Sequence, residues 1–292
     1  MNLATLLIFT VAAPVQAPGV GDAAGDNASK ARHGKLMDLY RGDAAGYTIY
    51  RDKTRKEKVE LQREPVYVWT NPVRSNGQDG AVFVWTCRGR AEVVGTIFSF
   101  PATGPRNLHH ELHSLATTVL DVHREGLETW KPEAAGIELK AMPDAPVPAR
   151  SPSLRFTQMR ALTREFSATG EDLDKKRWEQ RLLPQPLYRY QSIDPAVIDG
   201  AVFSFVSNAG TDPEVLLVLE ARKPASGAGG EPVWQYGIGR FSDMKLWVRY
   251  KGQEVYTAPL IHWNDPIQDP KQRYRSFRDR VIPPVEEESA SK

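Results

Sequence analysis

Three histidines and a glutamate, all with metal-binding side chains, lie close together in the segment His109-His110-Glu111-Leu112-His113. The segment is predicted to be a strand, and side chains two residues apart on a strand project from the same face. His109, Glu111 and His113 would therefore share one face. Two imidazoles and a carboxylate can hold zinc or a similar divalent ion and leave one position open for water. Glu111 could alternatively act as a general base with a histidine partner.

A more ordinary interpretation competes with this metal site. The zinc motif HExxH needs a helix and one more residue before its second histidine, and this segment has neither. Polar side chains are also normal on the solvent face of an antiparallel sheet. We therefore favour a polar strand face and expect no cofactor, with a divalent metal on His109, Glu111 and His113 as the alternative.

The rest of the sequence contains no motif that indicates catalysis. Ser114 has no G-x-S-x-G sequence around it, and no P-loop or Rossmann glycine pattern occurs. The single cysteine, Cys87, can form neither an internal disulfide nor a zinc site of cysteine pairs. These absences favour a non-catalytic protein over an enzyme.

The charge balance argues against a polyanionic partner. The 292 residues contain 38 Lys and Arg against 36 Asp and Glu, for a net charge of +2. So small an excess favours neither nucleic acid nor an anionic membrane surface as the main partner. Residues 271–278 are basic and aromatic, but acidic residues follow them, so we interpret them as a solvated surface segment.

The N-terminus is predicted to be an export signal. An apolar run at residues 3–13 is followed by Val15-Gln16-Ala17, which has the small-x-small character of a cleavage site. The run is too short to cross a bilayer. We therefore expect a signal peptide at residues 1–17, a flexible leader at 18–30, and an exported, periplasmic or secreted protein without a transmembrane segment in its mature chain.

Most of the remaining chain is predicted to be strand. Short alternating runs are separated by turn residues, and the predicted strands include residues 59–69, 81–86, 93–100, 201–206 and 215–220. The 22 prolines and 22 glycines favour a fold with many turns. We expect a first β-rich unit at residues 31–142, a proline-rich linker at 143–152, a second β-rich unit at 153–263 and a polar tail at 264–292. A helix is predicted at the start of each unit, at residues 30–40 and 153–166.

The two units are predicted to be copies of one folding unit. The pentapeptide Asp-Gly-Ala-Val-Phe occurs at residues 79–83 and again at 199–203. Pro-x-Tyr precedes it at residues 65–67 and 186–188, and Glu-Val follows it at 92–93 and 214–215. We therefore predict a duplication that covers residues 36–130 and 159–256.

The alternation within the repeated strands predicts how each unit is built. It gives residues 81–85 and 201–205 one aromatic face each, and such a face packs against a helix or another sheet. We expect an α+β fold that is rich in strands, with two duplicated antiparallel-sheet units, each preceded by a helix. The two sheets could alternatively join into one large sheet or half-barrel.

Four segments resemble those of a group of uncharacterised exported bacterial proteins. They are Trp-Thr-Asn-Pro at residues 69–72, Gly-Ala-Val-Phe at 80–83, His-Glu-Leu-His-Ser-Leu at 110–115 and Leu-Leu-Pro-Gln-Pro-Leu-Tyr-Arg-Tyr at 182–190. The resemblance covers most of the chain after the leader. It implies no activity and no functional residue.

Taken together, the sequence predicts a non-catalytic, exported binding or interaction module. Its expected partner is a protein or a small molecule, and nucleic acid is not expected. Two alternatives stay open. One is a metal-dependent enzyme that uses His109, Glu111 and His113, and the other is a periplasmic carrier whose curved sheet and helix enclose an apolar ligand.

Overall fold

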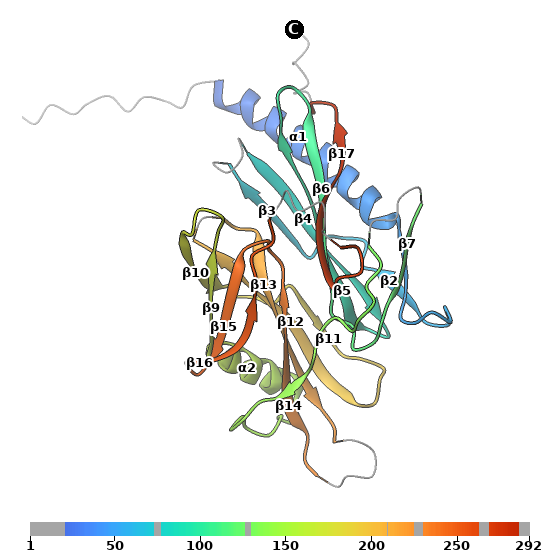
Figure 1. The fold of residues 1–292 in the computed structure, drawn as a ribbon, viewed down its shortest axis with the longest axis vertical. Helices are drawn as coiled ribbons and strands as arrows, with labels where there is room; N and C mark the ends of the chain where they lie inside the picture. The colour runs from blue at the N-terminus through green and yellow to red at the C-terminus, as the bar shows by residue number, and fades with distance from the viewer. Residues whose placement is uncertain are drawn as a thin grey trace, which may run out of the picture. The chain divides into compact units, whose positions relative to one another are not determined.

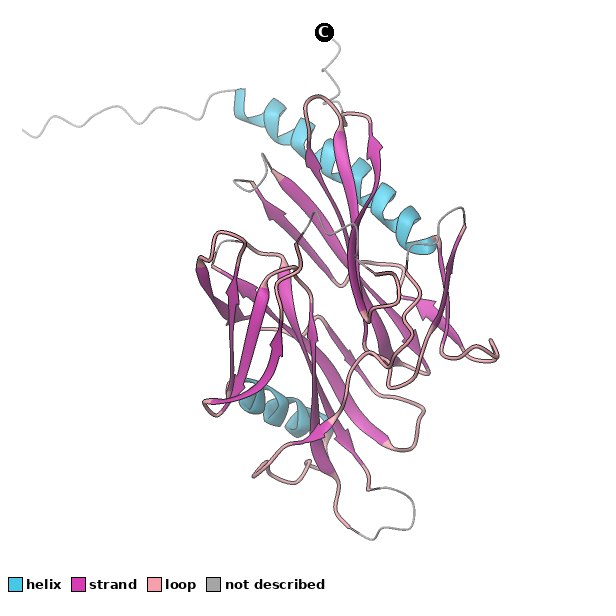
Figure 2. Ribbon diagram, viewed as in Figure 1, coloured by secondary structure: helices cyan, strands magenta, loops and turns pink. Residues whose placement is uncertain are grey.

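The computed structural model describes residues 21–72, 77–125, 130–208, 210–224, 230–262 and 269–285. These residues form antiparallel strands and two helices (Figure 2). The chain divides into two compact units, a smaller one of residues 1–36 and 285–292 and a larger one of residues 37–284. Helix α1 (Gly21–Ala45) begins in the smaller unit and ends in the larger one. Both sheets belong to the larger unit.

The first sheet contains eight strands (Figure 1). Seven follow the order β17-β6-β5-β4-β2-β1-β7, and β3 pairs with β4 beside them. The strands are β1 (Tyr47–Tyr50), β2 (Lys58–Leu61), β3 (Tyr67–Asn71), β4 (Gln78–Cys87), β5 (Arg90–Pro101), β6 (Arg106–Ser114), β7 (Asp121–Arg124) and β17 (Tyr274–Ile282).

The second sheet contains nine strands and is accompanied by helix α2 (Pro152–Thr163) (Figure 1). Eight strands follow the order β16-β15-β9-β10-β12-β13-β14-β8, and β11 pairs with β12 beside them. The strands are β8 (Lys140–Ala141), β9 (Phe166–Glu171), β10 (Arg177–Leu182), β11 (Tyr188–Tyr190), β12 (Val197–Ser207), β13 (Pro213–Arg222), β14 (Val233–Arg240), β15 (Lys245–Tyr250) and β16 (Gln253–Ala258).

The two sheets share one internal strand order. The path β6-β5-β4-β2-β1-β7 in the first sheet corresponds to β14-β13-β12-β10-β9-β15 in the second, and β3 and β11 pair with corresponding strands. The repeated pentapeptides lie in the corresponding strands β4 and β12. Trp69 pairs with Gly80 and Tyr190 pairs with Gly200 in the same register. With this common strand order and register, a residue in one sheet can be matched to a corresponding residue in the other.

A glycine beneath an aromatic ring recurs in both sheets. A Cβ atom at Gly80 would lie 2.3 Å from the indole of Trp69, and one at Gly200 would lie 2.4 Å from the ring of Tyr190. No side chain fits in that space. Each ring therefore lies directly over the backbone of the paired strand.

We expect Gly200→Ala to destabilise the fold because the new methyl group would displace the buried Tyr190 ring. Overpacking of this kind costs about 1–3 kcal/mol of unfolding free energy, which urea denaturation measures. Gly42→Ala in α1 is the matched control. Nothing lies within 4 Å of its Cβ position, so alanine should raise stability there through its helix propensity. Unchanged stability of Gly200→Ala would contradict this packing.

The aromatic faces of the repeated strands turn toward the helices, as the sequence predicts. In the second sheet, Phe203 and Phe205 lie in one buried cluster with Met159 of α2. In the first sheet, Tyr40 of α1 is fully buried and its hydroxyl donates to the main-chain oxygen of Asp79 at 3.0 Å. Each helix therefore covers the face that carries the large aromatic side chains.

The opposite faces of the two sheets pack against each other. Val82 and Val84 of β4 share a buried cluster with Val202 and Val206 of β12 and with Leu216 of β13. Burial of one aliphatic side chain contributes about 1.5–3 kcal/mol, so this layer holds the two halves of the larger unit together. The sheets do not merge into one, which was the alternative arrangement.

The predicted boundaries need three corrections. Residues 274–282 of the expected polar tail form β17, which pairs along β6 because Tyr274 and Ser276 on one of its faces are buried. Residues 140–141 of the expected first unit form β8, which pairs with β14 of the second sheet. Helix α1 begins at Gly21, inside the expected leader. The predicted signal peptide at residues 1–17 lies outside the described residues.

Two element predictions were also wrong. The helix predicted to reach residue 166 ends at Thr163, and Phe166 begins strand β9. The alternately buried Phe166, Ala168 and Gly170 fit a strand between β10 and β15. The single strand predicted at residues 59–69 is two strands, β2 and β3, with Pro65 between them. Proline lacks the N–H that a continuous strand would use.

Candidate functional site

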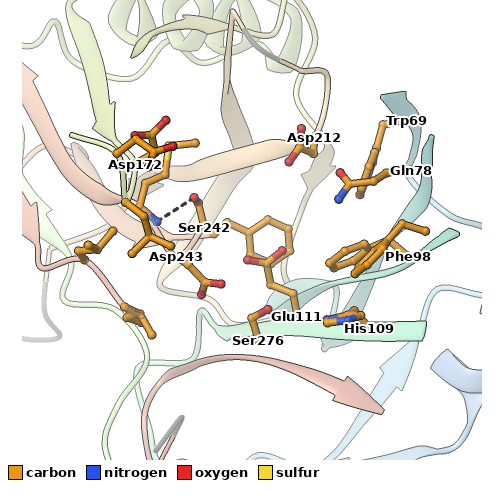
Figure 3. A pocket seen from close by; sticks show the side chains of 17 residues that line it. Trp69, Gln78, Phe98, His109, Glu111, Asp172, Asp212, Ser242, Asp243 and Ser276 are labelled. Carbon is orange, nitrogen blue, oxygen red and sulfur yellow. Dashed lines mark hydrogen bonds between the residues drawn. The ribbon is translucent and has the colours of Figure 1, made fainter. Parts of the chain in front are cut away.

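A cavity of about 610 Å³ lies between strands of the first sheet and turns of the second (Figure 3). Strands β3, β5 and β6 supply Trp69, Phe98, Phe100, His109 and Glu111. The turns after β9, β12 and β14 supply Asp172, Asp174, Asp212 and Asp243. The volume is that of a small-molecule site. One part of the wall is therefore aromatic and another is acidic.

The aromatic part consists of rings stacked along the first sheet. The centroid of the His109 ring lies 5.3 Å from that of Phe98 and 5.0 Å from that of Phe100. Phe98 lies 5.6 Å from Trp69, whose indole N–H donates to Thr96 at 3.2 Å. Burial lowers the pKa of His109 to about 4. This wall is therefore uncharged at neutral pH.

Hydrogen bonds fix the acidic turns in place. Asp172 accepts from the indole N–H of Trp178 at 2.8 Å and from the main-chain N–H of Lys176 at 2.9 Å. Asp212 accepts from the side-chain amide of Asn71 at 2.6 Å. The oxygen of that amide accepts from the main-chain N–H of Thr211 at 2.8 Å. Asn71 thus joins β3 of the first sheet to the β12–β13 turn of the second.

Glu111 and Asp243 of the cavity lining are joined through the buried hydroxyl group of Tyr274. The Tyr274 hydroxyl donates to Glu111 and lies 3.1 Å from Oδ1 of Asp243. One hydroxyl proton cannot serve both carboxylates, so a second proton is needed for two hydrogen bonds. Burial, reinforced by the charge of Asp243, raises the pKa of Glu111 well above its usual range. Burial therefore favours the protonated form of Glu111.

The structure separates the three residues that the sequence predicts to bind a metal. His109 and Glu111 line the cavity, whereas His113 lies deeper, with its ring 2.7 Å from the Cβ position of Gly239. Neither His113 nitrogen has a hydrogen-bond partner among the described residues. Burial lowers the pKa of His113 to about 3, so the ring is neutral. Metal binding by His109, Glu111 and His113 stays a prediction.

Within the described part of the chain, a different group brings metal-type ligand atoms together. Atoms of Asp43, His110 and Asp279 lie within 4.8 Å of one another. Arg124 and Arg280 each donate to both carboxylates, at distances from 2.5 to 3.2 Å. Two positive charges already balance the two negative ones, so a divalent ion would have to displace an arginine. We interpret this group as an ion-pair network that joins α1, β7 and β17 to β6.

Sequence reasoning missed the acidic residues of the cavity. Asp172, Asp212 and Asp243 follow different strands and meet only through the packing of the sheets. Aspartate is common in turns, so none of the three differs locally from an ordinary turn residue. The alternation that identified His109 and Glu111 has no equivalent in turns.

Comparisons of the chain with family models, curated proteins and solved structures found no match. Among the described residues, no helix is both long enough and apolar enough to cross a membrane.

Proposed function

We propose that this protein is a non-catalytic binding protein that holds a small ligand in the cavity between its two sheets. The observation that carries the proposal is the cavity itself, which combines stacked rings on one side with anchored carboxylates on another. Ligand sites typically combine an apolar lining with a few fixed polar groups that orient the ligand. The cavity therefore suits a ligand that has both an apolar part and a polar part.

The protonation states in the cavity support binding over catalysis. A general base works best when its pKa lies near the working pH. The pKa of His109 is about 4, well below neutral pH, so its imidazole is not set to act as a general base. Burial raises the pKa of Glu111 and favours its protonated form, which can donate a hydrogen bond. Their roles are to stack on a ligand and to accept or donate a hydrogen bond.

We also propose that the protein is exported and that its two halves arose by duplication. Export is supported by the apolar run and the small-x-small sequence before residue 18. Duplication is supported by the repeated pentapeptide, the common strand order and the matching registers over Gly80 and Gly200. Sequencing the N-terminus of the protein purified from the periplasm tests export, which predicts a chain that begins at Pro18.

Thermal unfolding in the presence of two small probes tests the binding proposal. We expect 2-phenylethylamine or 2-phenylethanol at millimolar concentration to raise the melting temperature, because a ligand that binds only the folded state stabilises it. Leu260 lines the cavity and is 38% exposed, so Leu260→Trp should narrow the opening and remove the shift.

Ile193→Trp is the matched control because Ile193 is 80% exposed and lies outside the cavity lining. This variant should keep the full shift. Two results would overturn the proposal: no shift with either probe, or equal shifts in the wild-type protein and in Leu260→Trp.

A further inference from the structure

The counterpart of the cavity in the other half of the molecule is filled by an arginine of the chain itself. Arg90, at the start of β5, is 3% exposed, and its Nε donates to Glu220 at 2.7 Å. Its Nη1 donates to the main-chain oxygen of Leu115 at 3.0 Å. Tyr190 donates to the same oxygen of Glu220 at 2.7 Å. Arg90 Nη1 also donates to Glu92 at 3.0 Å. A guanidinium is thus held there by two buried carboxylates and a carbonyl, and Tyr190 is hydrogen-bonded to one of the carboxylates.

Strand pairing locates the corresponding residues at the open cavity. Glu220 pairs with Gly200, and Phe98 pairs with Gly80, so Glu220 and Phe98 correspond. Tyr190 corresponds to Trp69 through the same two glycines. The two remaining residues at the buried guanidinium, Arg90 and Leu115, correspond to Asp212 and Phe241.

The correspondences of Arg90 with Asp212 and of Leu115 with Phe241 follow from the strand pairing and the main-chain hydrogen bonds next to them. Arg90 directly precedes Ala91, which pairs with Thr86, and Asp212 directly precedes Pro213, which pairs with Val206. Leu115 and Phe241 each donate their main-chain N–H to a matched glutamate, Glu92 and Glu214. All four counterparts line the open cavity. The place taken by the arginine side chain in one half is therefore open space in the other, with an aspartate where the arginine begins.

We infer that the cavity binds the cationic group of its ligand, a guanidinium or a protonated amine, between Asp212 and Asp243 and against the rings of Trp69 and Phe98. This inference rests on the proposed function and names the class of ligand. A cation over an aromatic face gains about 0.5–2 kcal/mol, and a carboxylate at hydrogen-bonding distance adds a charge-assisted bond. The apolar part of the ligand contacts Leu260 and Ile261 at the opening.

The charge of the cavity agrees with a cationic ligand. Five of the lining residues are acidic, and among the described lining residues none is lysine or arginine. Arg240 lies beside Tyr274, with its guanidinium 5.0 Å from the centroid of that ring. That guanidinium already donates to the main-chain oxygens of Ser242, Met244 and Pro259. An anionic ligand would be repelled by the carboxylates of the lining.

Isothermal titration with a charged probe and a neutral probe of similar shape tests the inference. We expect 2-phenylethylguanidinium to bind at least tenfold more tightly than 2-phenylethanol at pH 7.5 and low salt. Asp243→Asn and Asp212→Asn should each weaken the cation at least fivefold and change the neutral probe less than twofold. Glu179→Gln, an exposed acid on β10 outside the cavity lining, is the matched control and should change neither probe.

One further variant tests the comparison between the two halves directly. Asp212→Arg places an arginine where the other half has Arg90, and it should block both probes by filling the cavity. Equal affinity for the two probes, both lost in Leu260→Trp, would overturn the cationic preference while the binding proposal stands. Failure of both probes to bind the wild-type protein would overturn the binding proposal itself. Asparagine variants that melt normally but keep full affinity for the cation would also overturn the inference.

Discussion

Replacing Arg90 by methionine should lower the free energy of unfolding by about 3–5 kcal/mol. Arg90 is the cation between two buried carboxylates, with Glu220 at 2.7 Å and Glu92 at 3.0 Å. Methionine fills a similar volume but leaves both glutamates without this partner. Removal of one member of a buried ion pair costs several kcal/mol because the remaining charge stays in a medium of low polarity. Urea denaturation followed by circular dichroism measures the change.

Two further variants isolate the cause. Arg88→Met is the matched control, because Arg88 is more than half exposed in its ion pair with Glu57, and an exposed pair contributes about 0–1 kcal/mol. Adding Glu220→Gln to Arg90→Met should recover part of the loss, since one buried charge then disappears. A loss below 1 kcal/mol for Arg90→Met would show that the guanidinium is not needed to compensate the two glutamates.

Lowering the pH from 7 to 4 should cost the fold about 3 kcal/mol through His113 alone. The folded pKa of His113 is about 3 against an ordinary value of 6.5, because burial disfavours the imidazolium. The stability that depends on this lowered pKa is fully present above pH 6.5. As the pH falls from 6.5 toward 3, only the unfolded chain takes up the proton, so the free energy of unfolding decreases. Urea midpoints measured between pH 4 and 7 give the slope.

Removing the imidazole should flatten that slope. His113→Leu leaves a side chain of similar size without a titrating group. The decrease in the free energy of unfolding between pH 7 and 4 should therefore be about 3 kcal/mol smaller in this variant than in the wild-type protein. His33→Gln, which removes a partly exposed histidine of α1, should keep the wild-type slope. An identical slope in His113→Leu and the wild-type protein would show that His113 takes up its proton in the folded state.

The strands that the sequence predicts well are those whose pattern is local. Strands β4, β5, β12 and β13 are long apolar runs between turns, and each was predicted within a few residues. Strand β9 was missed because Phe166 also fits the helical spacing of α2, and its partners β10 and β15 are remote in sequence. Strand β17 was missed because arginine at 275, 278 and 280 hides the buried alternation of Tyr274 and Ser276. Both errors concern strands whose identity depends on tertiary pairing.

The residues of the site also divide into those that a local pattern predicts and those that only tertiary packing brings together. His109 and Glu111 are recognisable as polar residues two apart on a strand, and both line the cavity. Nothing local predicts that Tyr274 reaches Glu111 from 163 residues away or that Asp243 lies beside it. The charge of the cavity arises from turns brought together by sheet packing. The sequence pattern therefore predicts residues of the strand wall of the cavity but not the acidic residues of the turns.

The pairing of β17 with β6 also affects how the chain can fold during synthesis. Strand β6 has β5 on one side and β17 on the other, and β17 is encoded more than 150 residues later. Until residue 282 has left the ribosome, the free side of β6 exposes unpaired main-chain groups, and such an edge can pair with another chain. The second sheet, which ends at Ala258, can be complete while the first still has an open edge. A nascent chain arrested before residue 274 should therefore depend on chaperones to stay monomeric.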